Sequence, residues 1–461
     1  MKFFASTAFK IWREESSIDD VIKEFLDDVF SRNQQNIKKI KDEVRYQHLL
    51  AVGRTGCGKS SVLFYLMAQD IPKCLAGLRT MIYIDPVNGC DELLKSTGIW
   101  KSERVIYIDV SDPDSMPYLN LFETGRKRDG ILGTSHMINT FKSICSGLID
   151  QEMTPNMMNL FGYCARIMMY LDAPTLHDLY DLLIDPIGYM GHLDVPEDDP
   201  AYRFFAEDVG TLKQKGAYFD TVKYVRGRVH GFINDPIIER LLVNRNPTLS
   251  MAKAIEKGTI ILVSTRKADL GEDGCRLIGK YILSIVHRLM QERAHANISE
   301  CVPVMLYADE FQNLLNKGHD KTLSTMLDED RKFKLSVNLA TTRIGFMNTE
   351  MYDAVSSGTA VKICGTMVGR GGQMLASEIG VPADDIKDLP NYTLLMKIGA
   401  GTHAPTRIKS MKKPFKNVGR PNPRTPDLLR RKMRQHFGLG FKKQAPIALD
   451  CVNEIVDVRI E

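Results

Sequence analysis

Short apolar runs, separated by amphipathic segments, dominate the pattern along this chain. Each run has four or five residues and stops at glycine or polar positions, as buried parallel strands do. They cover residues 49–52, 81–84, 105–108, 260–263, 304–307 and 335–339. Helical periodicity lies between several of them. The pattern predicts an α/β fold in which helices flank both faces of a mostly parallel sheet.

The stretch between residues 122 and 258 is too long for one crossover connection and contains no convincing strand. One apolar stripe at helical spacing runs from Ile138 to Leu148. A second helix is predicted behind Thr175, which forms a Thr-x-x-Asp capping box with Asp178. We therefore expect an all-helical domain inserted into the α/β core.

Both ends of the chain differ from this core. An apolar stripe behind Ser17 predicts a helix over residues 17–45. Residues 397–443 contain fourteen Lys or Arg against one acid, which is typical of an arm or linker more than of a packed domain. The expected organisation is an N-terminal helical segment (1–45), the α/β core in two parts (46–125 and 251–400), the inserted all-α domain (126–250), and a basic C-terminal arm with a terminal strand (401–461).

Composition narrows the class of protein. The chain has 461 residues, 44% hydrophobic and 26% charged, which is typical of globular proteins. The sequence shows no apolar run long enough to span a membrane and no signal-peptide pattern at its start. Its nine cysteines are scattered without a C-x-x-C pair, which favours a reducing compartment. We expect a cytoplasmic protein, with any attachment to a membrane made through a partner.

A glycine-rich loop directly follows the first apolar run. It fits G-x-x-x-x-G-K-[ST] at every position, and the expected nucleotide-binding residues are Gly53, Arg54, Thr55, Gly56, Cys57, Gly58, Lys59, Ser60 and Ser61. Backbone N–H groups of such a loop point at phosphates, and the following helix adds the positive end of its dipole. Lys59 is expected to reach the β- and γ-phosphates of ATP, and Ser60 to bind Mg²⁺. A chance match in a turn is the alternative, and the strand–loop–helix context argues against it.

Two carboxylates end the run at residues 304–307. We expect Asp309 to hold Mg²⁺ and Glu310 to orient and deprotonate the attacking water. The alternative is an N-cap aspartate with a first-turn glutamate that only stabilise a helix. The P-loop upstream favours the catalytic interpretation.

These motifs together resemble the FtsK–HerA superfamily, and within it the conjugative type IV coupling-protein (TraG/TraD-like) ATPases. The resemblance covers about residues 46–400. It rests on the P-loop, on Tyr83-Ile84-Asp85-Pro86, on residues 307–313 (YADEFQN), on Thr175-Leu176-His177-Asp178-Leu179, and on Arg331-Lys332-Phe333 leading into Leu339-Ala340-Thr341.

The resemblance implies a RecA-like ATPase that forms a homo-hexameric ring, with ATP and Mg²⁺ at subunit interfaces and DNA in the channel. It implies that Arg331 is an arginine finger supplied in trans, and a surface helix arginine is the alternative. It also implies an ATP-driven DNA translocase in DNA transfer. Secretion, relaxase or nuclease proteins would be its partners.

Two features depart from that family. Thr342 stands where the family usually has a glutamine that senses the γ-phosphate, so Arg343 could take part instead. Coupling proteins usually begin with membrane-spanning helices, which this sequence lacks. The alternatives are therefore a HerA-like motor in DNA processing or defence, a viral genome-packaging motor, a P-loop ATPase that moves protein cargo, and an adaptor that binds ATP without hydrolysis.

Basic clusters are the candidates for DNA contact. One lies in the helical insert, with Tyr224 among its basic residues Lys213, Lys215, Lys223, Arg226, Arg228 and His230. The second is residues 397–443, which include Arg430, Arg431, Lys432 and Arg434, and a third follows a core strand at Ser264, Arg266 and Lys267. A solvated helix face or a contact with an acidic protein is the alternative for the first two.

Overall fold

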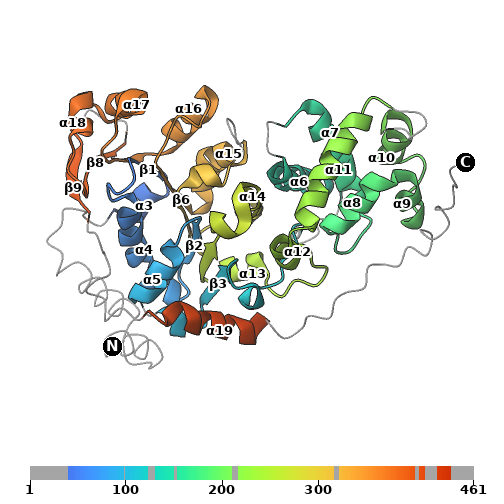
Figure 1. Cartoon of the computed structure of the whole chain (residues 1–461), viewed down its shortest axis with the longest axis horizontal. Helices are drawn as coiled ribbons and strands as arrows, with labels where there is room; N and C mark the ends of the chain where they lie inside the picture. The colour runs from blue at the N-terminus through green and yellow to red at the C-terminus, as the bar shows by residue number, and fades with distance from the viewer. Residues whose placement is uncertain are drawn as a thin grey trace, which may run out of the picture.

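In the computed structural model, a nine-stranded sheet forms the centre of the α/β part (Figure 1). The structure describes residues 40–97, 99–122, 130–149, 153–209, 216–315, 321–399, 404–410 and 423–437. The helix expected over 17–45 therefore lies outside the described residues except for its end, where α3 covers Asp42–Arg45. The expected terminal strand also lies outside them.

All six expected strands are present and buried, and the α/β fold class is confirmed. They are β1 (Leu49–Val52), β2 (Thr80–Asp85), β3 (Val105–Asp109), β4 (Ile260–Ser264), β5 (Val304–Ala308) and β6 (Leu335–Thr341). The order is β3-β4-β2-β5-β6-β1-β7-β8-β9, and β1 to β7 are parallel. Their apolar runs are continuous because both faces of the sheet are covered.

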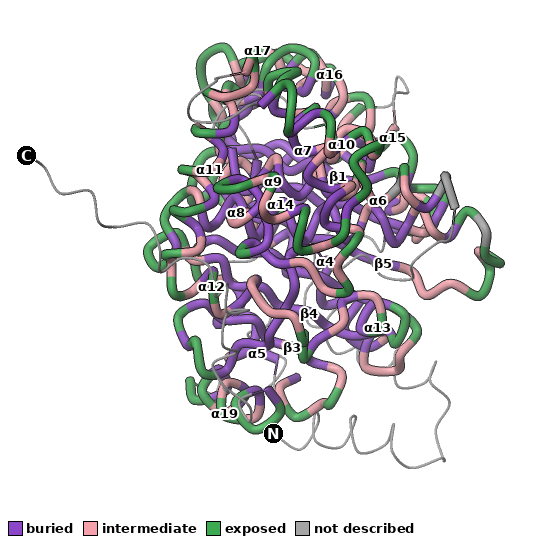
Figure 2. The backbone as a smooth tube through the Cα atoms, turned by 90° about the vertical axis from the view of Figure 1, so that its right-hand side faces the viewer, coloured by how far each residue is buried: buried purple, intermediate pink, exposed green. Residues whose placement is uncertain are grey.

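Three further strands extend the sheet beyond β1. They are β7 (Val361–Cys364), parallel to β1, and the antiparallel β8 (Thr393–Ile398) and β9 (Thr406–Lys409). The helices around the sheet are α4 (Lys59–Leu75), α5 (Gly89–Thr97), α14 (Lys267–Glu292), α15 (Lys321–Glu329), α16 (Thr349–Gly358), α17 (Gly369–Ile379) and α18 (Ala383–Lys387). Figure 2 shows the buried strands and α14 in the interior.

Helices fill the chain between β3 and β4, and most of them gather beside the α/β part (Figure 1). They are α6 (Gly130–Cys145), α7 (Pro155–Met168), α8 (Leu176–Ile184), α9 (Pro186–His192), α10 (Pro200–Arg203), the π-helical η4 (Phe204–Val209), α11 (Phe219–Ile233), α12 (Pro236–Leu242) and α13 (Met251–Glu256). The predicted capping box at Thr175 and Asp178 is present at the start of α8. An isolated bridge between Asn120 and Val243 joins the segments that lead into and out of these helices.

Part of the expected basic arm is a packed helix, so the expectation of an arm or linker is wrong for residues 425–437. Helix α19 (Thr425–Phe437) lies against β3 and α5 (Figure 1). Its buried residues Leu429, Met433 and Phe437 recur every four positions, which is the spacing of one helix face. The helix was not predicted because charged residues and prolines dominate the composition of this stretch.

Candidate nucleotide-binding site

The glycine-rich loop joins the end of β1 to the start of α4. Gly58 is the N-cap of α4 and has φ 109°, a conformation that favours glycine. A Cβ atom on Gly53 would lie 2.6 Å from Cys57 Sγ. The loop is also supported from outside, since Arg54 N donates to Thr366 O (2.9 Å) and Tyr392 N donates to Cys57 O (3.0 Å). The backbone path therefore requires small residues at these positions, as a phosphate cradle does.

Lys59 points back into this loop. Its side chain is buried, and Nζ donates to the carbonyls of Gly53 (2.9 Å) and Arg54 (3.4 Å). Thr55 and Gly56 are exposed at the tip of the loop. An ammonium that donates to backbone carbonyls of the loop suits a site that takes a polyphosphate. ATP therefore fits the residues present.

Ser60 and Asp309 come together beside Lys59. Asp309 follows β5 directly and is 7% exposed. Its burial raises the pKa of the carboxyl to about 6, although a hydrogen bond from the Ser60 hydroxyl opposes this rise. A hydroxyl and a carboxylate are hard oxygen donors of the kind that Mg²⁺ prefers. Mg²⁺ therefore fits this pair.

Asp85 is a second buried carboxyl, and it also lies at the carboxyl end of a strand. It ends β2, next to β5, and accepts hydrogen bonds from Val87 N (3.1 Å) and Cys90 N (2.9 Å). Burial raises its pKa. These two bonds give Asp85 a role in shaping the turn after β2, and its charge adds to the acidic side of the site.

Glu310 adopts a left-handed backbone conformation, with φ 44° and ψ 47°. Its Oε2 atom accepts hydrogen bonds from Gln312 Nε2 (2.5 Å) and from Thr342 Oγ1 (3.0 Å). Left-handed residues other than glycine are uncommon and occur often at functional sites. No role for Gln312 could be predicted from the sequence, because no spacing rule connects it with residues at the end of β6.

Arg331 lies away from the loop of its own chain. It is exposed on the 3₁₀ turn η7 (Asp330–Phe333), at the start of β6, whereas Thr341 at the end of β6 pairs with Val52 beside the loop. The seven residues of β6 span roughly 20 Å. The structure therefore does not bring Arg331 to the Lys59, Ser60, Asp309 and Glu310 cluster within one chain.

Several basic residues considered for DNA contact are engaged within the chain. Arg266 pairs with Asp109 (3.1 Å), Arg430 with Asp109 (2.6 Å) and Arg434 with Asp112 (2.7 Å). In the insert, Arg228 pairs with Asp273, Lys223 is exposed on α11, and Lys213 and Lys215 lie outside the described residues.

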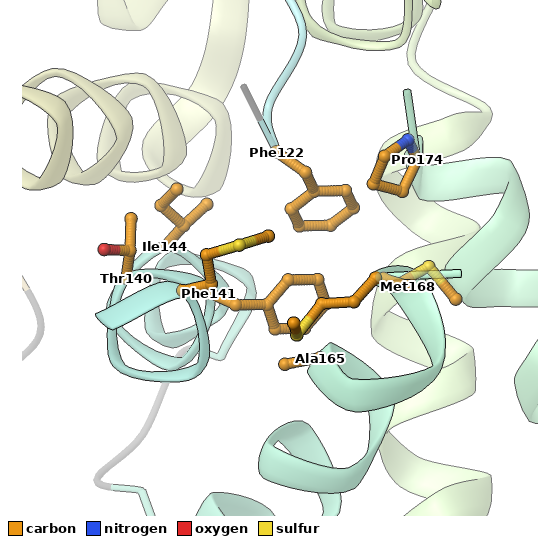
Figure 3. Close-up of a pocket in the computed structure, with 9 residues that line it drawn as sticks. Phe122, Thr140, Phe141, Ile144, Ala165, Met168 and Pro174 are labelled. Atoms are coloured by element: carbon orange, nitrogen blue, oxygen red, sulfur yellow. The ribbon is translucent and has the colours of Figure 1, made fainter. Parts of the chain in front are cut away.

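An apolar pocket lies between α6 and α7 in the helical part, away from the loop (Figure 3). Its lining is formed by Phe122, Met137, Thr140, Phe141, Ile144, Ala165, Met168, Met169 and Pro174. A lining without charged groups does not suit a nucleotide.

No helix among the described residues is long and apolar enough to cross a membrane.

The sequence matches no protein-family profile and no curated protein. Solved structures do match the fold. The plasmid coupling protein TrwB, in complex with a non-hydrolysable ATP analogue, has a TM-score of 0.58 at 14% identity over 83% of this chain and 91% of that one. TrwB with ADP and Mg²⁺ covers 81% and 86%, at the same score and identity. VirB4 of Thermoanaerobacter pseudethanolicus has a TM-score of 0.53 at 14% identity, over 82% and 92%.

At this identity the comparison concerns the fold. The chain has the P-loop ATPase fold of coupling proteins and VirB4, with a mostly parallel sheet flanked by helices. The resemblance inferred from the motifs is thus confirmed at the level of structure.

Proposed function

We propose that this protein is an ATP-driven DNA translocase that works as a ring, with a role like that of coupling proteins in DNA transfer. The observation that carries the proposal is the convergence of Lys59, Ser60, Asp309 and Glu310 at the carboxyl ends of the parallel strands. Arg331 lies at their amino ends. Within one chain, these four residues would supply the phosphate-binding, Mg²⁺-binding and proton-accepting groups that ATP hydrolysis needs. The position of Arg331 suits contact with the nucleotide of a neighbouring chain.

The residues divide the chemistry between them. The loop N–H groups and Lys59 would bind the phosphates and hold them in place for attack. Ser60 and Asp309 would hold Mg²⁺, which neutralises charge on the phosphates when bound. Glu310 would accept the proton of the attacking water.

The placement of Arg331 supports a ring if this residue is the arginine finger that the resemblance implies. A residue exposed at the amino ends of the strands meets a second nucleotide only if copies pack head to tail, and such contacts close into rings when the rotation permits. The hexamer, like the finger role of Arg331, rests on the family resemblance.

Support for DNA as the cargo comes from the fold shared with plasmid coupling proteins and from exposed basic residues such as Lys223. One observation favours a second candidate, an ATPase that moves protein cargo. Arg266, Arg430 and Arg434, which we expected to contact DNA phosphates, form ion pairs with aspartates of the same chain. Secretion, relaxase or nuclease proteins remain the proposed partners of a DNA motor.

Steady-state ATP hydrolysis with and without single- or double-stranded DNA tests the proposal, with Lys59→Ala as the blank. Stimulation by either DNA, lost in Lys59→Ala, is the expected result. A rate that depends on Lys59 but is indifferent to both DNAs would replace the DNA motor with the protein-cargo candidate.

A further inference from the structure

Tyr392 is held against the nucleotide-binding loop in an uncommon backbone conformation. It directly precedes β8 and has φ 62°, in the left-handed region. Its N–H group donates to the carbonyl of Cys57 (3.0 Å), and its carbonyl accepts the N–H of Ser410 (2.7 Å), the residue after β9. Residues other than glycine keep this conformation where the surrounding structure enforces it, and they cluster at ligand-binding sites. The backbone of Tyr392 is therefore a reason to look for a function at the loop.

The ring of Tyr392 borders the last glycine of that loop. A Cβ atom on Gly58 would lie 3.1 Å from Tyr392 Cδ1, so the ring contacts the residue that caps α4. The hydroxyl of Ser410 donates to the carbonyl of the same glycine (3.3 Å). Ser410 is buried, whereas Tyr392 is only partly buried. An aromatic side chain that is not fully covered thus lies beside the phosphate-binding backbone.

The order of the strands places Tyr392 and the proposed Mg²⁺ site on opposite sides of the loop. Asp309 follows β5, two strands from β1 on one side, and Tyr392 precedes β8, two strands from β1 on the other. Because β8 is antiparallel to β7, its start lies at the same ends of the strands as the loop. Mg²⁺ bridges the β- and γ-phosphates of a bound nucleotide. The γ-phosphate therefore lies toward β5, and the base extends toward β8.

We infer that Tyr392 is the residue on which the base of the bound nucleotide stacks. Every base has a π-face, so an aromatic ring binds it without a particular set of donors and acceptors. The loop binds the triphosphate and Tyr392 binds the nucleoside end, which separates nucleoside triphosphates from other polyphosphates. The inference rests on the proposed ATPase, and it names the part of the substrate that the loop itself does not recognise.

Calorimetric titration with two ligands tests this role, each in the presence of Mg²⁺. One is a non-hydrolysable ATP analogue, and the other is inorganic tripolyphosphate, which has no base. We expect Tyr392→Leu to raise the Kd of the ATP analogue about ten- to thirtyfold, the size expected for loss of one base–aromatic stack, and to leave the Kd of tripolyphosphate unchanged. Tyr392→Phe keeps the ring and should bind both ligands as the wild type does, whereas Lys59→Ala should weaken both.

A second variant gives a signal that does not depend on loss of affinity. Tyr392→Trp places an indole at the same position, and the ATP analogue should quench its fluorescence beyond the change seen in the wild type, while tripolyphosphate should not. Equal weakening of both ligands in Tyr392→Leu would show that the ring only supports Gly58 by packing. That result, an unchanged Kd for the ATP analogue, or no added quenching in Tyr392→Trp would overturn the inference while the proposed ATPase stands. A wild type that binds neither ligand would overturn both.

Discussion

A buried ion-pair network ties the P-loop helix to the strand that carries the acidic pair. Asp70 on α4 is fully buried and accepts hydrogen bonds from Arg45 Nη1 and Nη2, both at 2.7 Å. It also accepts from Arg79 and from the hydroxyl of Tyr307 at 2.5 Å. Tyr307 lies two residues before Asp309. The network therefore fixes α4 against β5 close to the proposed catalytic residues.

Asp70→Asn should destabilise the α/β part severely. The asparagine is nearly isosteric, so the loss is electrostatic: two buried guanidinium groups lose their shared carboxylate. Breaking a buried pair costs about 3–5 kcal/mol of unfolding free energy. Arg79 keeps its contact with Asp42, whose side chain is 30% exposed, so we expect a loss near the lower bound, about 3 kcal/mol.

The same network predicts how stability depends on pH. Burial alone would raise the pKa of Asp70, but the charges of Arg45 and Arg79 outweigh burial and lower it from 3.8 to about 2. A lowered pKa contributes stability that is complete above the unfolded value and is lost as the pH falls from about 4 to 2. At about 1.4 kcal/mol per unit, this contribution is about 2.5 kcal/mol.

Urea unfolding of the wild type and Asp70→Asn, followed by circular dichroism from pH 7 down to pH 2, measures both effects. Asp42→Asn is the matched control and should cost less than about 1 kcal/mol, because its partly exposed pairs are screened by water. A loss below about 1 kcal/mol in Asp70→Asn, or equal losses in the two variants, would refute the reasoning. An unchanged difference between wild type and Asp70→Asn across the acid range would refute its pH part.

Three further predictions concern the site and the C-terminal helix. Glu310→Gln should retain ATP affinity in a fluorescent-analogue titration and lose turnover at least a hundredfold; wild-type turnover would exclude Glu310 as the base. Arg331→Ala, titrated into wild-type rings, should depress ATP turnover more than its own fraction, whereas strict proportionality would rule out a finger in trans. Arg430→Leu should speed tryptic cleavage in α19 several-fold, because Arg430 holds that helix to Asp91 and Asp109; the exposed Arg431→Leu is the control, and equal cleavage of the two would contradict this role.

The core strands could be predicted from sequence because each is a continuous apolar run that ends at a polar or glycine residue. β9 could not, since it is an edge strand with one buried residue in four, Ile408. Helix α19 was missed for another reason. Its apolar face is narrow, and three of its four basic residues in 430–434 meet acids that lie more than three hundred positions away in sequence.

The chemical groups of the site could be named in advance because a P-loop fixes the spacing of its own residues. Contacts between different strands cannot be read in this way. The meeting of Gln312 with Thr341 depends on the parallel register of β5 and β6, which brings Ala308 beside Leu339. For the same reason, the distance between Arg331 and the loop of its own chain could not be predicted from the sequence.

Direct observation of movement along DNA tests the central claim. The measurement is ATP-dependent displacement of streptavidin from biotinylated single-stranded DNA, and of a triplex-forming strand from double-stranded DNA. The account predicts displacement from at least one of these DNAs by the wild type and none by Lys59→Ala. Lys59-dependent hydrolysis without displacement from either DNA would contradict a DNA translocase.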